Sequence, residues 1–269
     1  NLLPTFGVLG DGDVVLDDTY QENRDIMYST TIGVDHTFRF SPRQPWLWQS
    51  SLTQYNALYD TEKDLDLNYF HAATGPAYRN GRYSLGLQAA YGSLERDYDT
   101  YLRTFGGVLK GNCVVNDSMA AVADVRVEDR KYYQSPGRDG MYYRTGIGPV
   151  VVFGKNRVSC QVGMEGLNAD DRVEAYDCIF ASLSAERDLG AGFTAFAKYE
   201  FKTGEYEEDD PLFADRREDD EHEVAVGIRK VITNNVTASL VHTYTDVDST
   251  IELYEYDRNV TNLSLTVGF

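Results

Sequence analysis

The chain has 269 residues, with 43 acidic and 25 basic side chains and a formal net charge of −18. Such a chain lacks the basic footprint that binds nucleic acids or anionic lipids, and it contains no apolar run of about 18 residues that would form a transmembrane helix. The composition includes 20 Tyr and 23 Gly but only 7 Pro, which favours extended antiparallel sheet over helix.

Apolar and polar residues alternate with period 2 along most of the chain. Between residues 28 and 40 the even positions are mostly apolar or aromatic, whereas the odd positions are polar or small. The pattern recurs at 83–91, 193–202 and 260–269. These segments reach about ten residues, the length that a tilted strand needs to cross a bilayer, whereas strands of a soluble sandwich usually have about 5–6. The alternation therefore predicts a transmembrane β-barrel.

The predicted connections are of two kinds that alternate along the chain. Short turns are expected at Ser41–Pro45, Arg79–Arg82, Gly111–Asp117, Gly154–Arg157, Arg187–Gly192 and Thr233–Asn235. Longer acidic links are expected at Asp17–Asp25, Asp60–Asp64, Glu95–Asp99, Glu128–Gly140, Asn168–Glu174, Glu205–Asp220 and Asp246–Asp257. Short periplasmic turns and long extracellular loops are typical of outer-membrane barrels.

About 13 strands can be counted from Tyr28 to Phe269, and a weaker first strand fits within Leu2–Leu16. Bacterial single-chain barrels have an even number of strands, so we expect about 14, with 12 and 16 as alternatives. The prediction is an all-β, transmembrane antiparallel up-and-down β-barrel that forms one domain over residues 1–269, in the outer membrane of a Gram-negative bacterium. Because the chain starts at Asn1 without a signal peptide, we expect a processed or truncated product, or only the ordered part of a longer chain, with any periplasmic N-terminal domain absent from this chain.

The C-terminal residues continue the alternation and end in an aromatic side chain. Leu263, Leu265, Val267 and Phe269 resemble the signal that the barrel-assembly machinery reads, which implies that machinery as a partner. Outer-membrane lipid and lipopolysaccharide are the other partners expected of such a barrel.

Three segments, RREDDEHEVAVGI at 216–228, TYTDVDST at 243–250 and YEYDRN at 254–259, resemble the closing strands of surface lipoprotein assembly modifiers. The resemblance covers roughly the last 60 residues. In that family a periplasmic tetratricopeptide-repeat domain precedes a barrel of 14 strands that passes lipoproteins or other proteins to the cell surface. The resemblance therefore implies export, with a periplasmic repeat domain or a secreted cargo as partner.

Charged residues within the alternating segments are expected to face the lumen, because the other face meets lipid. The strand phases we favour place ten such side chains inward: Asp35, Arg39, Asp124, Arg126, Arg144, Lys198, Glu200, Lys202, Glu223 and Arg229. Two hypotheses remain open for these rows of mixed sign. They create a transverse field that selects solutes by charge and size, or they belong to a hydrated interior that tolerates charge.

Most of the negative charge lies in the predicted outer links. These acidic runs bridge to lipopolysaccharide phosphates through divalent cations, repel anions, or are simply solvated. No cofactor is expected apart from such loop-bound cations, and the three cysteines and four histidines show no metal-ligand spacing. We also expect that the link Glu205–Asp220 can fold inward and narrow the pore.

Cys160 and Cys178 lie on neighbouring predicted strands. If the link between them centres near Ala169, the two side chains face each other, and a cross-strand disulfide can form in the oxidising periplasm. Two free thiols are the alternative.

An enzymatic reading rests on Asp220 with His222 and on Asp64 with Asp66. Omptin-type outer-membrane proteases use an Asp–His pair and an Asp pair across the barrel mouth to activate water. The strand phase points His222 toward lipid beside Val224, so we predict that the chain is not an enzyme.

Three functional hypotheses follow from these observations. The first, from the resemblance, is a barrel that exports or displays a protein or polysaccharide with a periplasmic partner. The second is a general or cation-preferring diffusion porin. The third is a structural or adhesive barrel whose acidic loops bind cations.

Overall fold

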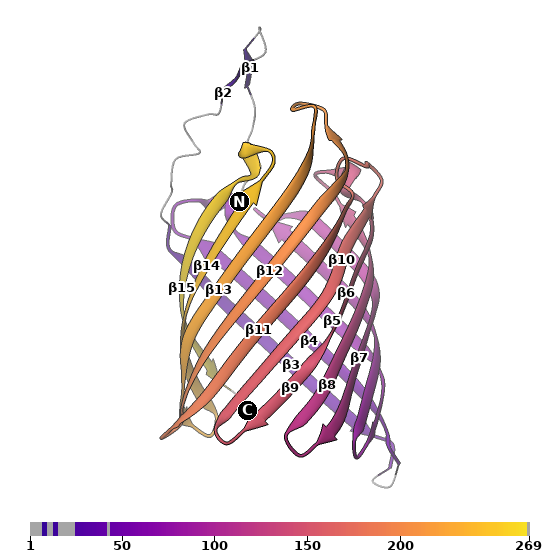
Figure 1. Ribbon diagram of the computed structural model, residues 1–269, viewed down its shortest axis with the longest axis vertical. Coiled ribbons are helices and arrows are strands. Elements are labelled where there is room, and N and C mark those ends of the chain that lie inside the picture. The colour runs from indigo at the N-terminus through magenta and orange to yellow at the C-terminus, as the bar shows by residue number, and fades with distance from the viewer. Residues whose placement is uncertain (1–6, 10–12, 16–24, 42–43, 268–269) are drawn as a thin grey trace.

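The computed structural model describes residues 7–9, 13–15, 25–41 and 44–267. Thirteen of its strands form one antiparallel sheet in which each strand pairs with its neighbours along the chain (Figure 1). They are β3 (Met27–Arg39), β4 (Trp46–Tyr59), β5 (Leu67–Asn80), β6 (Tyr83–Arg96), β7 (Asp99–Asn116), β8 (Met119–Tyr132), β9 (Gly140–Phe153), β10 (Asn156–Ala169), β11 (Tyr176–Gly190), β12 (Phe193–Asp210), β13 (Asp215–Thr233), β14 (Val236–Ser249) and β15 (Tyr256–Val267).

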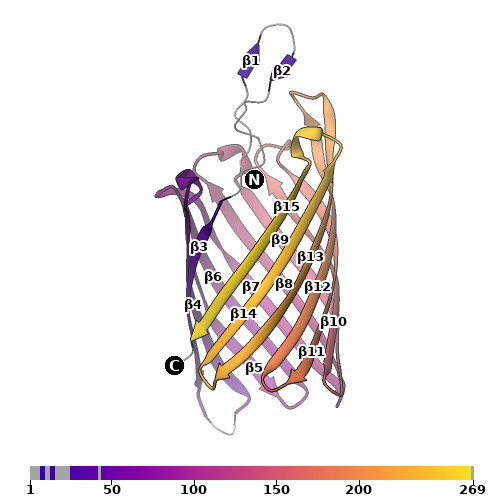
Figure 2. The same cartoon turned by 90° about the vertical axis from the view of Figure 1, so that its left-hand side faces the viewer.

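The sheet curls into a barrel, which brings its two edge strands to the same side of the molecule (Figure 2). Those edges are β3 and β15, and both run from the upper to the lower end of Figure 1 because the sheet has an odd number of strands. The up-and-down barrel is the predicted fold, and its 13 strands lie within the expected range of 12 to 16. No helix in the described part of the chain is long and apolar enough to cross a membrane.

The N-terminal stretch departs from the predicted first strand. Two short strands, β1 (Gly7–Leu9) and β2 (Asp13–Val15), pair only with each other and stay outside the large sheet. The remainder of Leu2–Leu16 lies outside the described residues. The even count inferred from parity is therefore not found among the described strands.

The connections sort to two ends of the barrel, as the sequence predicts. At the lower end, tight turns use Gly81 (φ +50°) and Gly154 (φ +58°), a backbone conformation that glycine adopts without steric cost. At the upper end, three connections contain short 3₁₀ turns: η2 (Lys63–Leu65), η3 (Pro136–Arg138) and η4 (Glu252–Tyr254).

Several upper links are shorter than predicted, because the strands continue into the acidic sequence. Most of Glu205–Asp220 is a paired hairpin, since β12 ends at Asp210 and β13 begins at Asp215. Glu205 lies opposite Glu218, and Arg216 offsets this repulsion by donating to the Glu205 carboxylate at 2.7 Å. The hairpin projects above the barrel in Figure 1, so the expectation that it folds inward is wrong.

Side chains alternate between an apolar outward face and a polar inner face. Large hydrophobic side chains stay exposed on the outward face, where lipid takes the place of a protein core. Leu263, Leu265 and Val267 lie on this face, and Leu263 is 79% exposed. Phe269 lies outside the described residues. The role of these residues as an assembly signal stays a prediction.

Candidate functional site in the barrel lumen

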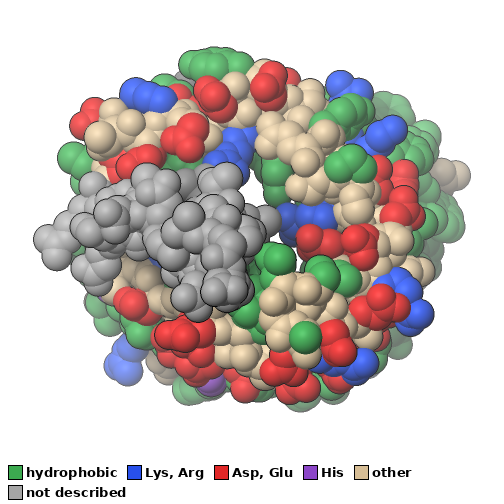
Figure 3. Space-filling model, turned by 90° about the horizontal axis from the view of Figure 1, so that it is seen from above, with side chains coloured by type: hydrophobic (Ala, Val, Ile, Leu, Met, Phe, Trp, Pro, Cys, Tyr) green, Lys and Arg blue, Asp and Glu red, His purple; other side chains and the backbone are tan. Residues whose placement is uncertain are grey.

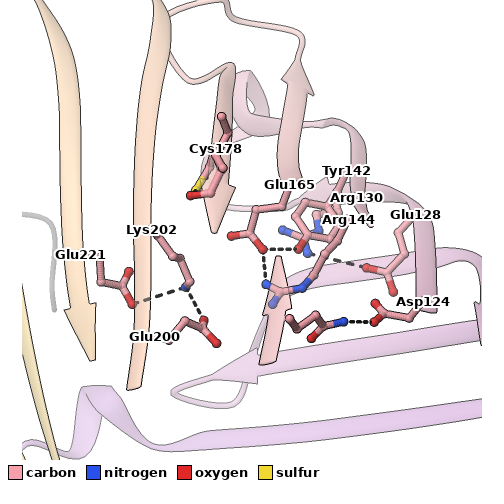
Figure 4. A network of polar contacts seen from close by, with 12 residues as sticks. Asp124, Glu128, Arg130, Tyr142, Arg144, Glu165, Cys178, Glu200, Lys202 and Glu221 are labelled. Atoms are coloured by element: carbon pink, nitrogen blue, oxygen red, sulfur yellow. Dashed lines mark hydrogen bonds and ion pairs between the residues drawn. The ribbon is translucent and has the colours of Figure 1, made fainter. Parts of the chain in front are cut away.

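The inner face is divided into two unlike walls. We call the inner face of β8–β13 the charged wall, because ion pairs and buried aromatic rings cover it (Figure 4). We call the inner face of β4–β7 the small-residue wall. It carries many small side chains, among them Ser51, Ala73, Gly75, Ala77, Ser84, Gly86, Ala90, Gly92 and Gly106. Larger inner side chains, such as those of Tyr55, Tyr69 and His71, lie toward the upper end of these strands.

Glu165 on β10 lies at the centre of the charged wall. Its register partner on β9 is Arg144, which donates to the Glu165 carboxylate, and the hydroxyl of Tyr142 donates to the same oxygen at 3.2 Å. The guanidinium of Arg144 also covers the ring of Phe180 at 4.0 Å. Phe180 is only 1% exposed, so this part of the lumen is packed like a protein core.

Glu128 on β8 forms a second buried ionic group. It is 4% exposed and pairs with Arg126 at 3.3 Å and with Arg130 at 3.7 Å. Arg130 in turn stacks on the Tyr142 ring at 3.4 Å, which joins this group to the Glu165 cluster. A carboxylate buried this deeply requires such paired cations, because an isolated buried charge is costly.

The third group joins β12 and β13. Lys198 contacts Glu200 at 3.0 Å and Glu223 at 3.3 Å. Lys202 contacts Glu200 at 3.6 Å and Glu221 at 3.4 Å. The carboxylates and ammonium groups therefore alternate along the wall, and their fields largely cancel at a distance.

The structure places the other lumen candidates at the margins of this network. Asp124 accepts a hydrogen bond from the Gln161 amide, and Arg229 contacts Glu186 at 3.4 Å. Asp35 and Arg39 lie on the distant strand β3, where they pair in register with Ser51 and Leu47 of β4. Eight of the ten candidates thus lie on β8–β13, and Asp35 and Arg39 do not join them.

Glycine keeps the small-residue wall thin at two positions. A Cβ atom on Gly75 would lie 2.0 Å from the carbonyl oxygen of Leu87, and one on Gly106 would lie 2.0 Å from that of Val127. No side chain fits at such a distance, so only glycine permits this approach of the strands. The charged wall has the same close approach at Gly148 and Gly163.

The upper mouth is ringed by acidic side chains, as Figure 3 shows from above. Arg217 lies within this rim, where it pairs with Asp219 at 2.6 Å and stacks on Tyr254 at 3.6 Å. Figure 3 also shows a hollow near the centre of the mouth with basic side chains beside it. No group of three or more His, Cys, Asp or Glu residues in the described chain is arranged to hold a metal ion.

Asp25 fastens the start of β3 to the connection between β4 and β5. Its carboxylate accepts hydrogen bonds from the backbone N–H groups of Glu62 at 2.9 Å and Thr61 at 3.1 Å, and from the Thr61 hydroxyl at 3.0 Å. These donors, with the Glu62 N–H contributing most, lower the pKa of Asp25 to about 2.

The proposed disulfide between Cys160 and Cys178 is wrong. Cys160 pairs in register with Leu183 and faces outward, whereas Cys178 pairs with Glu165 and faces inward. The β10–β11 hairpin is thus centred between residues 171 and 172 rather than near Ala169, a shift of five positions in pairing. An odd shift reverses the face of a strand residue. All three cysteines of the described chain are unpaired.

The residues considered for an omptin-type site do not come together. His222 lies on the outward face, as predicted, stacked between Tyr199 and Phe201 and hydrogen-bonded to the Tyr199 hydroxyl at 2.8 Å. Asp66 accepts a hydrogen bond from the backbone N–H of Tyr59 at 2.7 Å, in the connection between β4 and β5. No Asp–His pair therefore faces an Asp pair across the mouth among these residues.

Sequence reasoning missed several side chains of the lumen. Glu128 and Arg130 have the same phase as Asp124 and Arg126, so continued alternation was the signal for them. Because the segment is rich in charge, it was instead assigned to the predicted link Glu128–Gly140. Lys110 was missed because Gly107 and Gly111, at outward positions of β7, interrupt the apolar alternation around it.

No protein-family profile and no curated protein match the chain. Among solved structures, OmpT, an outer membrane protein of Vibrio cholerae, is similar with a TM-score of 0.56 and 8% identity, over 90% of this chain and 95% of that one. The CymD monoaromatic hydrocarbon channel is similar with a TM-score of 0.53 and 12% identity, over 93% of this chain and 90% of that one. At these identities the similarity concerns the fold alone. The chain has the fold of an outer-membrane β-barrel, and the predicted outer-membrane location agrees with this fold and with its apolar outward face.

Proposed function

We propose that the chain is a diffusion channel for small hydrophilic solutes across an outer membrane. The observation that supports this function is the contrast between the two inner walls. Side chains of the charged wall are packed and paired, with Glu128, Tyr142 and Phe180 all buried. The lower part of the small-residue wall leaves a space of about 100 Å³, so we place the passage off-centre along β4–β7.

The arrangement of charge suggests how such a channel sorts solutes. Along the charged wall most carboxylates have a cationic partner, and Asp124 accepts a hydrogen bond from the Gln161 amide, so a passing solute meets mainly local dipoles. The acidic rim attracts cations to the upper mouth and repels anions from it. We therefore propose modest charge preference at the mouth and selection mainly by size within the lumen.

The experiment is a measurement of solute flux through the purified chain. Single-channel conductance in a planar bilayer and swelling of vesicles in sugars of increasing size should both report an open pore. The substitution Ser51→Trp, on the small-residue wall, should lower the conductance and the size of the largest sugar that passes. The substitution Leu52→Trp, at the adjacent outward residue, is the matched control and should change neither the conductance nor the size limit for sugars. The channel would be refuted if the protein shows no conductance and no solute flux although its heat-modifiable gel shift proves that it is folded.

Export of a protein or polysaccharide with a periplasmic partner is the second candidate function. The C-terminal segments at 216–228 and 243–250 favour it through their resemblance to surface lipoprotein assembly modifiers. This function predicts a barrel that is closed to sugars when isolated and that conducts only with its partner. The same measurements therefore separate the two candidates.

A further inference from the structure

A second polar site lies in the lower part of the lumen, away from the charged wall. It is a pocket of about 100 Å³ on the small-residue wall, formed by the four consecutive strands β4–β7. Its lining residues are Gln49, Ala77, Tyr78, Arg79, Ser84, Leu85, Gly86, Gln88 and Lys110. Tyr78 and Leu85 have outward phase, and the lining residues of inner phase are all small or polar.

The strand register brings two cations to this pocket. Lys110 on β7 pairs with Gly86 on β6, and Arg79 on β5 pairs with Ser84 at the next inner position of β6. Neither cation makes an ion pair within the described chain. Asp124 is the register partner of Lys110 on β8, but its carboxylate accepts from the Gln161 amide and does not line the pocket.

The other polar groups of the pocket complete a set of donors. Gln49 and Gln88 each carry an amide with two N–H donors, and Ser84 carries a hydroxyl. No carboxylate is among the lining residues. Two cations with neutral donors match an anion that has several acceptor oxygens, because charge-assisted hydrogen bonds are the strong ones.

The floor of the pocket is open because it is built from small residues. A Cβ atom on Gly86 would lie 3.5 Å from Oε1 of Gln49 and 3.7 Å from Cβ of Ala77, which is ordinary contact. A longer side chain at Gly86 would therefore occupy the pocket without a clash with the backbone. This gives a way to fill the site while leaving Lys110 and Arg79 unchanged.

We propose that this pocket is an oxyanion-binding subsite, which holds the carboxylate or phosphate group of a small solute in the lumen. The inference deepens the proposed channel function, on which it rests, by naming the class of solute. Arg79 and Ser84 lie next to the tight turn between β5 and β6, at the end opposite the acidic rim. An anion therefore reaches the subsite most readily from the lower, turn-bearing end.

The test uses the full chain folded in detergent, with inorganic phosphate and acetate as separate probes. Saturable line broadening of the phosphate ³¹P or acetate methyl resonance measures binding directly. Replacing Lys110 by Gln should raise the half-saturating concentration about tenfold, which is the loss of one charge-assisted hydrogen bond in a solvated site. Lys155→Gln removes a charge from an exposed turn residue at the same end and should leave binding unchanged.

Two further variants separate loss of the site from loss of the fold. Arg79→Gln should weaken binding as Lys110→Gln does, and Gly86→Leu should abolish it by filling the pocket. Each variant is compared by its heat-modifiable gel shift, which should match that of the wild type. If these variants weaken the binding of phosphate, of acetate or of both, the subsite is supported. The anion whose binding is weakened identifies the group that the subsite accepts.

Two results would overturn the subsite. One is the absence of saturable binding of either anion, and the other is equal binding by the wild type and the folded Lys110→Gln and Gly86→Leu variants. The channel function fails by a different result, a folded barrel that binds phosphate but conducts nothing. Conductance without anion binding leaves the channel intact and refutes the subsite alone.

Discussion

Replacement of Glu165 by Gln tests whether the charged wall is packed or solvated. The change keeps the size of the side chain and removes its charge, which leaves Arg144 without its counter-ion. The Glu165 side chain is 11% exposed and that of Arg144 is 27% exposed, so the pair lies between a surface pair and a fully buried one.

The expected cost follows from this intermediate burial. Two unit charges about 4 Å apart attract by about 4 kcal/mol at an effective dielectric constant of about 20, and the free energy of desolvation offsets part of this. Exposed pairs contribute about 0–1 kcal/mol, whereas breaking a buried pair costs about 3–5 kcal/mol. We expect Glu165→Gln to lower the free energy of unfolding by about 2 kcal/mol.

The assay is reversible urea unfolding of the barrel in vesicles, followed by the fluorescence of Trp46 and Trp48. Glu207→Gln is the matched control, because it breaks a pair with Arg172 whose side chains are 40% and 65% exposed. It should cost less than about 1 kcal/mol. A double variant that also replaces Arg144 by Met should recover part of the loss, since no unpaired charge remains.

Equal costs for Glu165→Gln and Glu207→Gln would refute this reasoning. The charged wall would then be as well hydrated as the rim. The contrast between a packed wall and an open one would lose its physical basis, and with it the off-centre passage.

Three further predictions can be checked on the same protein. Oxidised and reduced protein should migrate identically in a denaturing gel, because Cys160 and Cys178 lie on opposite faces of the sheet; a shift on oxidation would contradict the register. Asp25→Asn should speed proteolysis of the β4–β5 connection at neutral pH but not near pH 2. The folded pKa of Asp25, about 2, lies below its usual 3.8, so its stabilisation is present above pH 4 and is lost as the pH falls toward 2. Gly163→Ala should cost about 1–3 kcal/mol in urea unfolding, because its Cβ would lie 2.0 Å from a backbone oxygen. Gly107→Ala, whose Cβ has its nearest neighbour at 3.7 Å, should cost clearly less; equal costs would contradict the prediction.

Alternation predicted the faces of the strands well, because lipid and the hydrated lumen impose opposite requirements on successive residues. Arg144 shows why: a charge cannot face lipid cheaply, so it sets the phase of all of β9. The same rule failed at Glu128 and Arg130, where a run of charges was taken for a loop. Inside a barrel such a run is compatible with a strand, since its inner residues can pair with one another and its outward residues can rise above the lipid.

The sequence pattern does not determine the strand register across the upper connections. The position of Cys178 opposite Glu165 depends on where the β10–β11 connection turns, and this acidic stretch contains no Gly or Pro signal that fixes its centre. The lower turn at Gly154 carries a glycine and was located correctly, whereas the turn predicted at Gly111–Asp117 is wrong, because β7 continues to Asn116. The anion pocket depends on the three registers that join β4, β5, β6 and β7, so the pattern alone could not show that Lys110 and Arg79 lie together.

The proposed channel function assigns stability and selectivity to different halves of the barrel. Glu165 and Phe180 are buried within the charged wall, where a change mainly alters the free energy of unfolding. Lys110 and Arg79 are exposed on the small-residue wall, where we expect a change mainly to alter which solute is held. A solute passing the small-residue wall does not need to break the ion pairs opposite. Variants of Glu165 should therefore shift urea midpoints without changing anion affinity, and variants of Lys110 should do the reverse. If both kinds of variant changed both properties, the two walls would act as one coupled network.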